Sequence, residues 1–311
     1  MNLREADRVE ITVLVDNYID ALLTQSTETV KRARISPNYT KEGKGLLAEH
    51  GLSCLIKVYA DKEEHMILFD LAISPTCFFN NAELLEIDLN KVEAVVLSHG
   101  HFDHFGALEE FLKRIKKEIP VFLHPDAFLP RRLNLPNRIL ELPILDETKL
   151  KNAGAMLQKI KKPTLLASDL ILVLGEVERI TDFEKGFPGA EVKIDNEWVK
   201  DHFFDDQGVV IKVKNKGLVI LSGCAHAGII NTIKYAMKIT KTDKIHTVMG
   251  GFHLTGPIFE PLIDLTIKEL KKINPDFIAP MHCTGWKAIS QFAKEMPKEF
   301  LLNTVGTTYI F

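Results

Sequence analysis

A short polar run near the first third of the chain carries groups that bind metal ions. Residues 98–104 read Ser-His-Gly-His-Phe-Asp-His and directly follow the apolar run at 95–97. His99, His101 and His104 place three imidazoles, and Asp103 a carboxylate, within six positions. Imidazoles and carboxylates are common metal ligands, and a tight turn after a buried strand can direct alternate side chains to two neighbouring points. The spacing predicts a site for two divalent metal ions.

Two cations close together favour hydrolytic chemistry. They lower the pKa of a bridging water and polarise a carbonyl or phosphoryl oxygen, so that hydroxide attacks without a Ser or Cys nucleophile. Asp103, besides binding metal, is expected to orient this water or accept its proton. His253 ends another strand and is expected to assist a leaving group or contact substrate, with a structural hydrogen bond as the alternative.

Composition limits the class of protein. The chain has 311 residues, 46% hydrophobic and 26% charged, with a formal net charge of −3, as expected of a globular chain with a large core. The absence of a basic excess argues against a nucleic-acid partner. Its first residues resemble neither a signal peptide nor a membrane span, so we expect a cytoplasmic protein without a membrane partner. Its four cysteines are scattered, which argues against a disulfide framework or zinc ribbon.

Apolar periodicity predicts a repeated order of strand, polar corner and helix. In the first half we expect a hairpin of strands 55–60 and 66–69, a strand at 92–97 and an amphipathic helix that ends at Pro120. In the second half we expect strands at 209–213, 218–221, 245–249 and 277–280, with helices around 229–237, 263–270 and 289–296. The corners after these strands carry Cys224, His226, His253 and His282. Two sheets packed back to back with helices outside would bring the corners to one rim.

Several motifs resemble the metallo-β-lactamase superfamily. They are Asp70 after the apolar strand at 67–69, the run His99-x-His101-x-Asp103-His104, the triplet Ser222-Gly223-Cys224, and His282 after Ala279-Pro280. Further runs are similar to the branch that contains the archaeal 7,8-dihydropterin-6-methyl-4-(β-D-ribofuranosyl)aminobenzene-5′-phosphate synthase. These runs lie at 49–53, 97–101, 223–226, 250–254 and 282–285.

The resemblance implies an αββα sandwich, an α/β fold in which two sheets pack face to face with helices outside. It implies one domain over residues 1–311 and a dinuclear site, with His99 and His101 on the first metal and Asp103, His104 and His282 on the second. It also implies that Asp70 orders the histidine loop through hydrogen bonds rather than binding metal.

The sequence departs from the superfamily pattern at two ligand positions. The segment that usually supplies a third histidine to the first metal reads Phe-Asp-Asp-Gln-Gly at 204–208, and Cys224 stands where a bridging Asp is usual. We expect His226 to replace the missing imidazole, with Asp206 as the alternative. Cys224 is either a ligand or a small buried residue. Zinc is the expected metal, and iron or manganese is left open.

The segment from about 125 to 204 carries no ligand cluster and is interpreted as a substrate-specific insert. Its arginines suit recognition of a small, phosphorylated substrate, although arginines in a loop are also common on solvated surfaces. The candidate substrate residues are Arg131, Arg132, Glu176 and Arg179. His50 and His124 are expected to be structural.

Three functional classes stay open at this point. The ligand set favours a metal-dependent hydrolase of an ester, amide or phosphoester. The branch motifs favour a synthase that joins a pterin-methyl group to a ribosyl-aminobenzene phosphate in pterin cofactor biosynthesis. A ligand sensor or an iron redox protein is the third class, because one fold hosts many functions. The sequence fixes neither the natural substrate nor the oligomeric state.

Overall fold

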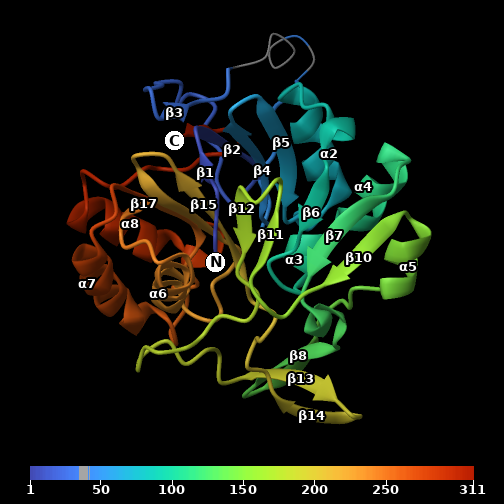
Figure 1. The fold of residues 1–311 in the computed structure, drawn as a ribbon. Helices are drawn as coiled ribbons and strands as arrows, with labels where there is room; N and C mark the ends of the chain where they lie inside the picture. Colours follow the sequence, from blue (N-terminus) through green and yellow to red (C-terminus); the bar gives the residue numbers. More distant parts are fainter. Residues whose placement is uncertain (35–40, 42) are drawn as a thin grey trace.

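Two large sheets pack face to face in the computed structural model, which describes residues 1–34, 41 and 43–311 (Figure 1). The first sheet contains, in order, β10 (Ala155–Lys159), β7 (Ile119–Leu123), β6 (Ala94–Val96), β5 (Glu63–Phe69), β4 (Ser53–Ala60), β2 (Arg8–Val15), β19 (Thr308–Ile310) and β3 (Val30–Lys31). The second contains β11 (Thr164–Leu166), β12 (Ile171–Val173), β15 (Gly208–Val213), β16 (Gly217–Ser222), β17 (Ile245–Gly251) and β18 (Phe277–Met281), with β1 (Glu5–Ala6) paired to β15.

Alternating apolar side chains fill both faces of each sheet. In β4, Cys54, Ile56 and Val58 face the opposite sheet, whereas Leu55 belongs to the cluster beneath the helices. This follows from the two-residue period of a strand, and it explains why these strands read as continuous apolar runs rather than as alternating ones. The central core therefore lies between the sheets, with a second and a third core on their outer faces.

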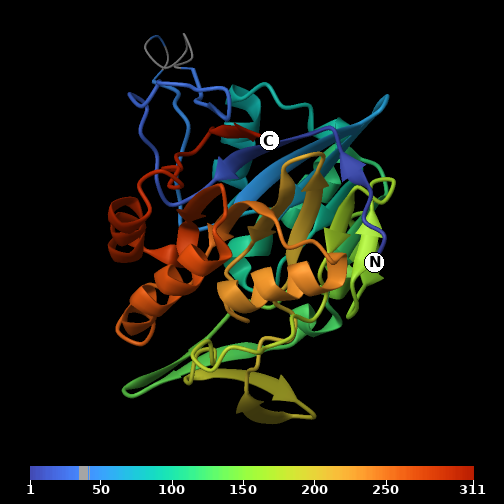
Figure 2. The same cartoon turned by 60° about the vertical axis from the view of Figure 1, so that its left-hand side comes forward.

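Helices cover the outer face of each sheet. One side carries α2 (Pro75–Leu84), α4 (Leu108–Ile115) and α5 (Glu147–Asn152), and the other carries α6 (Ile229–Thr240), α7 (Ile263–Ile273) and α8 (Trp286–Glu295) (Figures 1 and 2). Single turns of 3-10 helix lie at Leu89–Lys91, Pro125–Phe128, Glu260–Leu262 and His282–Thr284. The expected αββα sandwich is confirmed. Over residues 1–34, 41 and 43–311, no helix combines the length and the apolar character that a membrane crossing requires.

The expected hairpins are present, but the helix after the histidine run differs from expectation. β4 pairs antiparallel with β5, and β15 with β16. The single helix expected up to Pro120 is instead two helices, α3 (Phe102–Phe105) and α4, and the second ends at Ile115. Lys116 adopts a left-handed conformation with φ of 49°, which closes α4, and Pro120 lies inside β7. The helix therefore ends through backbone geometry rather than at a proline.

Residues 125–204 divide between the sandwich and a separate small sheet. The separate sheet contains β14 (Glu197–Lys200), β13 (Ala190–Ile194), β8 (Arg131–Leu135) and β9 (Arg138–Glu141), and we call it the accessory sheet. The hairpin of β8 and β9 projects from the body of the molecule (Figure 2). In contrast, β10, β11 and β12 pair with strands of the two large sheets. Only part of the segment is therefore additional to the sandwich.

The two sheets approach each other closely just beyond the ends of β6 and β16. A Cβ atom built on Gly223, which follows β16, would lie 2.1 Å from Oγ of Ser98 and 3.1 Å from Oδ2 of Asp70. Ser98 and Asp70 are fully buried, so neither can move aside into solvent. Only glycine fits at this contact, and it lets the corner after β16 approach the histidine turn.

We predict that Gly223→Ala lowers the free energy of unfolding by about 2–3 kcal/mol, because the added methyl group overpacks a buried contact. Denaturant unfolding of the two proteins measures this difference. Gly256→Ala is the control: its Cβ would meet nothing within 4 Å, and its φ of 86° adds only backbone strain, worth about 1 kcal/mol. Equal losses for both variants would show that the close contact at Gly223 is unimportant.

Candidate metal centre

The carboxyl ends of strands from both sheets deliver the candidate ligands to one rim. His99 follows β6, Cys224 and His226 follow β16, His253 follows β17, and His282 follows β18. β6 runs parallel to β5 and β7, and β16, β17 and β18 run parallel to one another. Because parallel strands end at the same edge of a sheet, residues far apart in the sequence converge there.

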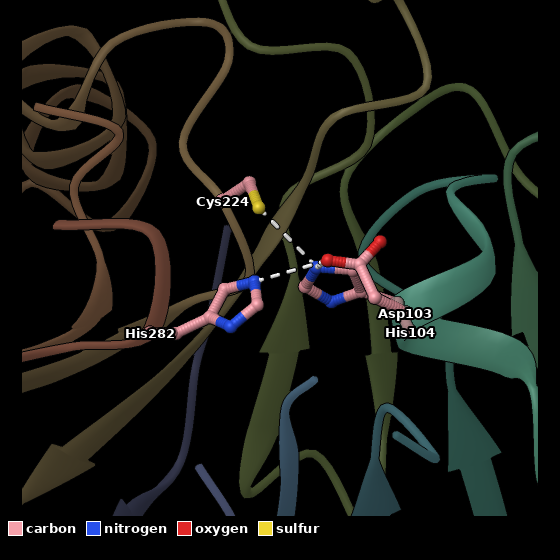
Figure 3. A group of neighbouring side chains, drawn as sticks. All are labelled: Asp103, His104, Cys224 and His282. Carbon is pink, nitrogen blue, oxygen red and sulfur yellow. Dashed lines mark hydrogen bonds and ion pairs between the residues drawn. The ribbon is translucent and has the colours of Figure 1, made fainter. Parts of the chain in front are cut away.

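Within the described residues, three groups of side chains bring ligand atoms within 4.8 Å of one another. The first group is His99, His101 and His226, and the second is Asp103, His104, Cys224 and His282 (Figure 3). The third, Cys224, His226 and His253, shares one member with each of the others. The structure thus brings together all seven residues that the sequence proposed as metal ligands, in two adjacent sets.

Unpaired buried nitrogens show that these groups suit a cation. Nε2 of His99, both ring nitrogens of His282 and Nδ1 of His253 are buried without a hydrogen-bond partner. Nε2 of His104 lies 3.2 Å from Sγ of Cys224, and Nε2 of His282 lies 3.4 Å from Oδ2 of Asp103. Buried polar atoms without partners are uncommon in folded proteins. Imidazole, thiolate and carboxylate donors in this arrangement fit a divalent metal such as zinc.

Asp70 fixes the orientation of the histidine turn. Its Oδ1 accepts a hydrogen bond from the backbone N–H of Ser98 at 2.7 Å, and its Oδ2 accepts from Oγ of Ser98 and lies 2.7 Å from Nδ1 of His104. A proton on Nδ1 of His104 leaves Nε2 free to face Cys224. The structure thus places Asp70 where the sequence expected it, behind the ligands rather than among them.

Asp16 supports His282 through its backbone, a role that no local motif in the sequence indicates. Its Oδ1 accepts the backbone N–H of His282 at 2.8 Å, and Nδ2 of Asn303 donates to its Oδ2 at 2.6 Å. His282 has a φ of 52°, a strained conformation for a residue other than glycine. The carboxylate of Asp16, at the end of β2, therefore holds a strained ligand-bearing corner in place.

His226, rather than Asp206, joins His99 and His101. Nε2 of His226 lies 3.2 Å from Nδ1 of His101. Asp206 instead accepts the backbone N–H of Ala227 at 2.9 Å through Oδ2, so it orders the turn that carries His226. The ring of Phe203 stacks on His226, with centroids 4.3 Å apart and an interplanar angle of 13°. Of the two candidates for the third position, geometry favours the histidine.

Burial and nearby charges together give the histidines of the two main groups opposite pKa shifts. Burial lowers the pKa values of His99 and His226 well below the usual range, and burial together with the charge of Arg131 lowers that of His101 to about 4. Burial also disfavours charge on His104, but the carboxylates of Asp70 and Asp103 outweigh it and raise its pKa to about 9. The first group is therefore neutral at pH 7, which is the form that binds a metal.

A cavity of about 590 Å³ opens over these groups. Its floor includes His101, Asp103, Cys224, His226 and His253. Its walls come in part from the accessory-sheet hairpin and from the segment at 255–259. Most of the wall residues are apolar: Phe102, Leu133, Leu135, Pro136, Leu142, Phe187, Phe203, Pro257, Ile258 and Phe259. Apolar walls with a few polar groups at one end are typical of a small-molecule site.

The candidate substrate residues lie elsewhere. Within the described chain, none of the four lines this cavity. Arg131 is buried between the carboxylates of Asp201 and Asp205, at 2.8 Å from each, and Arg132 pairs with Glu191. We therefore correct the phosphate-binding role expected for these arginines, because internal carboxylates already neutralise both guanidinium groups.

Glu176 and Arg179 are likewise engaged with other parts of the chain. Glu176 lies 3.0 Å from Nε2 of His124, which is buried and has the structural role expected of it. Arg179 donates to the backbone carbonyl of His202. Neither side chain lines the cavity.

Two cavity residues were missed or misread from sequence. His50, expected to be structural, has an exposed side chain at the cavity, stacks on His282 with ring centroids 5.0 Å apart, and lies 3.6 Å from Asp103. Glu49 anchors its loop by accepting the backbone N–H groups of Ile73 and Ser74. Cys283 also lines the cavity. In the sequence, only the position of His50 beside Glu49 and that of Cys283 beside His282 could indicate that these residues belong to the site.

The fold and the ligand groups agree with comparisons to known proteins. The family model described as the metallo-beta-lactamase superfamily matches residues 60–187, and a curated relative that is 34% identical covers 88% of the chain. The chain belongs to the metallo-beta-lactamase superfamily. Membership implies that it binds a divalent metal.

That relative is the 7,8-dihydropterin-6-methyl-4-(β-D-ribofuranosyl)-aminobenzene-5′-phosphate synthase of Methanocaldococcus jannaschii, matched over 278 residues and 94% of its own length. The crystal structure of Tm1679, a metal-dependent hydrolase of the beta-lactamase superfamily, aligns with a TM-score of 0.73 and 24% identity, over 96% of this chain and 98% of that one. The metallo-beta-lactamase fold protein YhfI from Bacillus subtilis aligns with a TM-score of 0.53 and 11% identity, over 98% and 100%. At such identities the structural likeness shows the fold alone.

We predict that Asp70→Asn weakens metal binding at the second group by about 10–100-fold, because both oxygens of Asp70 accept hydrogen bonds and the amide NH2 that replaces one of them can only donate. Competition titration with a chromophoric chelator measures the change. Asp243→Asn, at an exposed position, serves as the control. Unchanged affinity in Asp70→Asn would contradict the orienting role of Asp70.

We predict that acid destabilises the metal-free protein through the first group. The pKa of His101 is about 4 in the folded protein and about 6.5 in an unfolded chain. The unfolded state therefore binds more protons between these values, and the free energy of unfolding falls as pH drops through this window. Denaturant unfolding at several pH values should show a shallower fall for His101→Ala, whereas His202→Ala, at an exposed position, should match the parent protein. If the free energy of unfolding of His101→Ala falls with pH as steeply as that of the parent protein, this assignment is wrong.

Proposed function

We propose that this protein is a metal-dependent synthase that forms a dihydropterin-6-methyl-(ribofuranosyl)aminobenzene phosphate product or a close analogue. The observation that carries the proposal is the 34% identity to the synthase of M. jannaschii over 94% of that protein's length. An apolar cavity that opens onto the ligand groups also supports it. This conclusion replaces hydrolysis, which the metal-binding motif alone had favoured.

We also propose that two divalent ions, most simply zinc, bind side by side. His99, His101 and His226 would hold the first, and Asp103, His104, Cys224 and His282 the second. Nitrogen and sulfur donors favour zinc, although iron and manganese stay open as alternatives. When bound, such ions supply positive charge that polarises a substrate oxygen or nitrogen.

The cavity walls suit planar aromatic substrates. The rings of Phe187, Phe203 and Phe259 lie around the approach to His226 and His253. Aromatic side chains bind flat heterocycles by offset stacking and edge contacts. The hairpin of the accessory sheet supplies Leu133 and Leu135 to the same wall, so we assign substrate selection to this sheet.

Polar groups at the floor can orient the reacting atoms. His253 has a buried Nδ1 without a hydrogen-bond partner. The centroid of its ring lies 4.4 Å from the ring centroid of His226. His50 reaches the cavity from the opposite side, above Asp103. Each histidine can donate or accept a hydrogen bond with the substrate amine or with the pterin ring.

A metal-dependent hydrolase is the second candidate. It is favoured by one observation, the adjacency of the two ligand groups through the shared neighbours Cys224 and His226. Paired metals are common in hydrolytic sites of phosphate and amide substrates. The two candidates differ in what they need from the cavity, because hydrolysis requires one substrate and synthesis requires two.

The test combines synthesis and hydrolysis assays on metal-loaded protein. An activated dihydropterin-6-methyl donor and 4-(β-D-ribofuranosyl)aminobenzene 5′-phosphate should yield the joined product by mass spectrometry, and chelation should abolish its formation. Phe203→Ala should lower kcat/KM about 10-fold or more, since it removes a stacking wall and the packing of His226. Ile180→Ala, an exposed position, is the control. Turnover of esters, lactams or phosphodiesters without joined product would favour the hydrolase instead.

A further inference from the structure

The guanidinium of Arg131 joins three segments that meet beside the first ligand group. Its Nε donates to Oδ2 of Asp201 at 2.8 Å, and its Nη2 lies 2.8 Å from Oδ1 of Asp205. All three side chains are at most 4% exposed. A guanidinium can contact two buried carboxylates at once through different nitrogens, which the single ammonium nitrogen of a lysine cannot reproduce.

Each carboxylate continues the connection to a different part of the site. Oδ2 of Asp205 accepts the backbone N–H of Gly100 at 2.8 Å, and Gly100 stands between His99 and His101. A Cβ at Gly100 would lie 2.2 Å from the backbone oxygen of Ala127, so this turn has no room to shift. Asp205 therefore fixes the backbone between two ligands of the first group.

Asp201 holds the aromatic neighbour of the third ligand. Its Oδ1 accepts the backbone N–H of Phe203 at 2.7 Å. The ring of Phe203 stacks on His226 and meets His101 edge-on, with ring centroids 5.7 Å apart. Through its two carboxylate partners, Arg131 thus reaches every residue of the first group.

Arg131 also begins the strand that forms part of the cavity wall, although its own side chain does not line the cavity. This strand is β8, and Leu133 and Leu135 on it line the cavity. Residues two and four positions apart on a strand lie on one face. The face of β8 that encloses the cavity is therefore the face that carries the guanidinium toward the histidine turn. Arg132 lies on the opposite face, where it pairs with Glu191 and stacks over Trp198.

We propose that Arg131 is a positioning residue that holds the accessory sheet and the first ligand group, His99, His101 and His226, in a single fixed arrangement. The inference rests on the proposed metal binding but not on the identity of the substrate. The second group depends on other supports, because Asp70 backs His104 and Asp16 backs His282. Loss of the Arg131 contact consequently acts on one metal ion and spares the other.

Cobalt binding to Arg131→Lys and Arg132→Lys tests this directly. The two variants carry the same substitution at adjacent positions, on opposite faces of β8. Cys224 belongs to the second group and not to the first, so a thiolate-to-cobalt absorption band reports the second group. With Arg131→Lys, one equivalent of cobalt should still produce this band. The second equivalent should bind about 10–100-fold more weakly than it binds to the parent protein. Arg132→Lys should bind both ions as the parent protein does.

Asp205→Asn provides a second variant, which loses the charge but keeps an oxygen for Gly100, and it should show a smaller loss at the same ion. Thermal unfolding of the metal-free variants accompanies each titration. Parental affinity for both ions in Arg131→Lys overturns the proposal, and so does equal weakening of both ions. Failure of the synthase assay would leave this result unaffected, because the readout is metal binding alone.

Discussion

The structure depends on keeping buried ligand atoms without hydrogen bonds to residues outside the ligand groups. Nε2 of His99 and both ring nitrogens of His282 have no hydrogen bond in the folded protein. An unsatisfied buried polar group costs about 1–3 kcal/mol, so the fold must secure these side chains by other atoms. Ser98, Asp70 and Asp16 do so, because they bind the opposite ring nitrogen of a ligand or its backbone and leave the metal-facing atom open.

Backbone strain at the strand ends serves the same purpose. Asp70, Ala225, His253 and His282 all have φ between 49° and 58°, and none is glycine. Each stands where a strand of the sandwich ends and the chain turns across the rim. Left-handed backbone at such residues costs roughly 1–3 kcal/mol and persists only where neighbouring contacts determine it. The strain is thus concentrated where side chains must turn inward, while the strands themselves stay regular.

Local patterns in the sequence predict several of the sandwich strands, the histidine turn and the corners at Cys224, His226, His253 and His282. These features depend on side-chain alternation and on residues a few positions apart, which a sequence displays directly. The roles of Asp16 and Arg131 could not be predicted in this way. Asp16 binds the backbone of a residue 266 positions away, and Asp205 binds Gly100 across 105 positions. For Arg131 the sequence leaves only phosphate recognition or a solvated surface open, because nothing near it in the sequence indicates two buried carboxylates.

The walls of the cavity agree with the synthase function proposed above. Of the residues described in its walls, none is a lysine or arginine, and the charged or ionisable groups gather at its floor. Apolar walls contribute packing and exclude water, but they do not attract an ionised phosphate. A substrate with a phosphate tail would therefore insert its aromatic part and leave the tail toward solvent. Such walls suit the binding of flat aromatic rings better than the capture of an ionised phosphate.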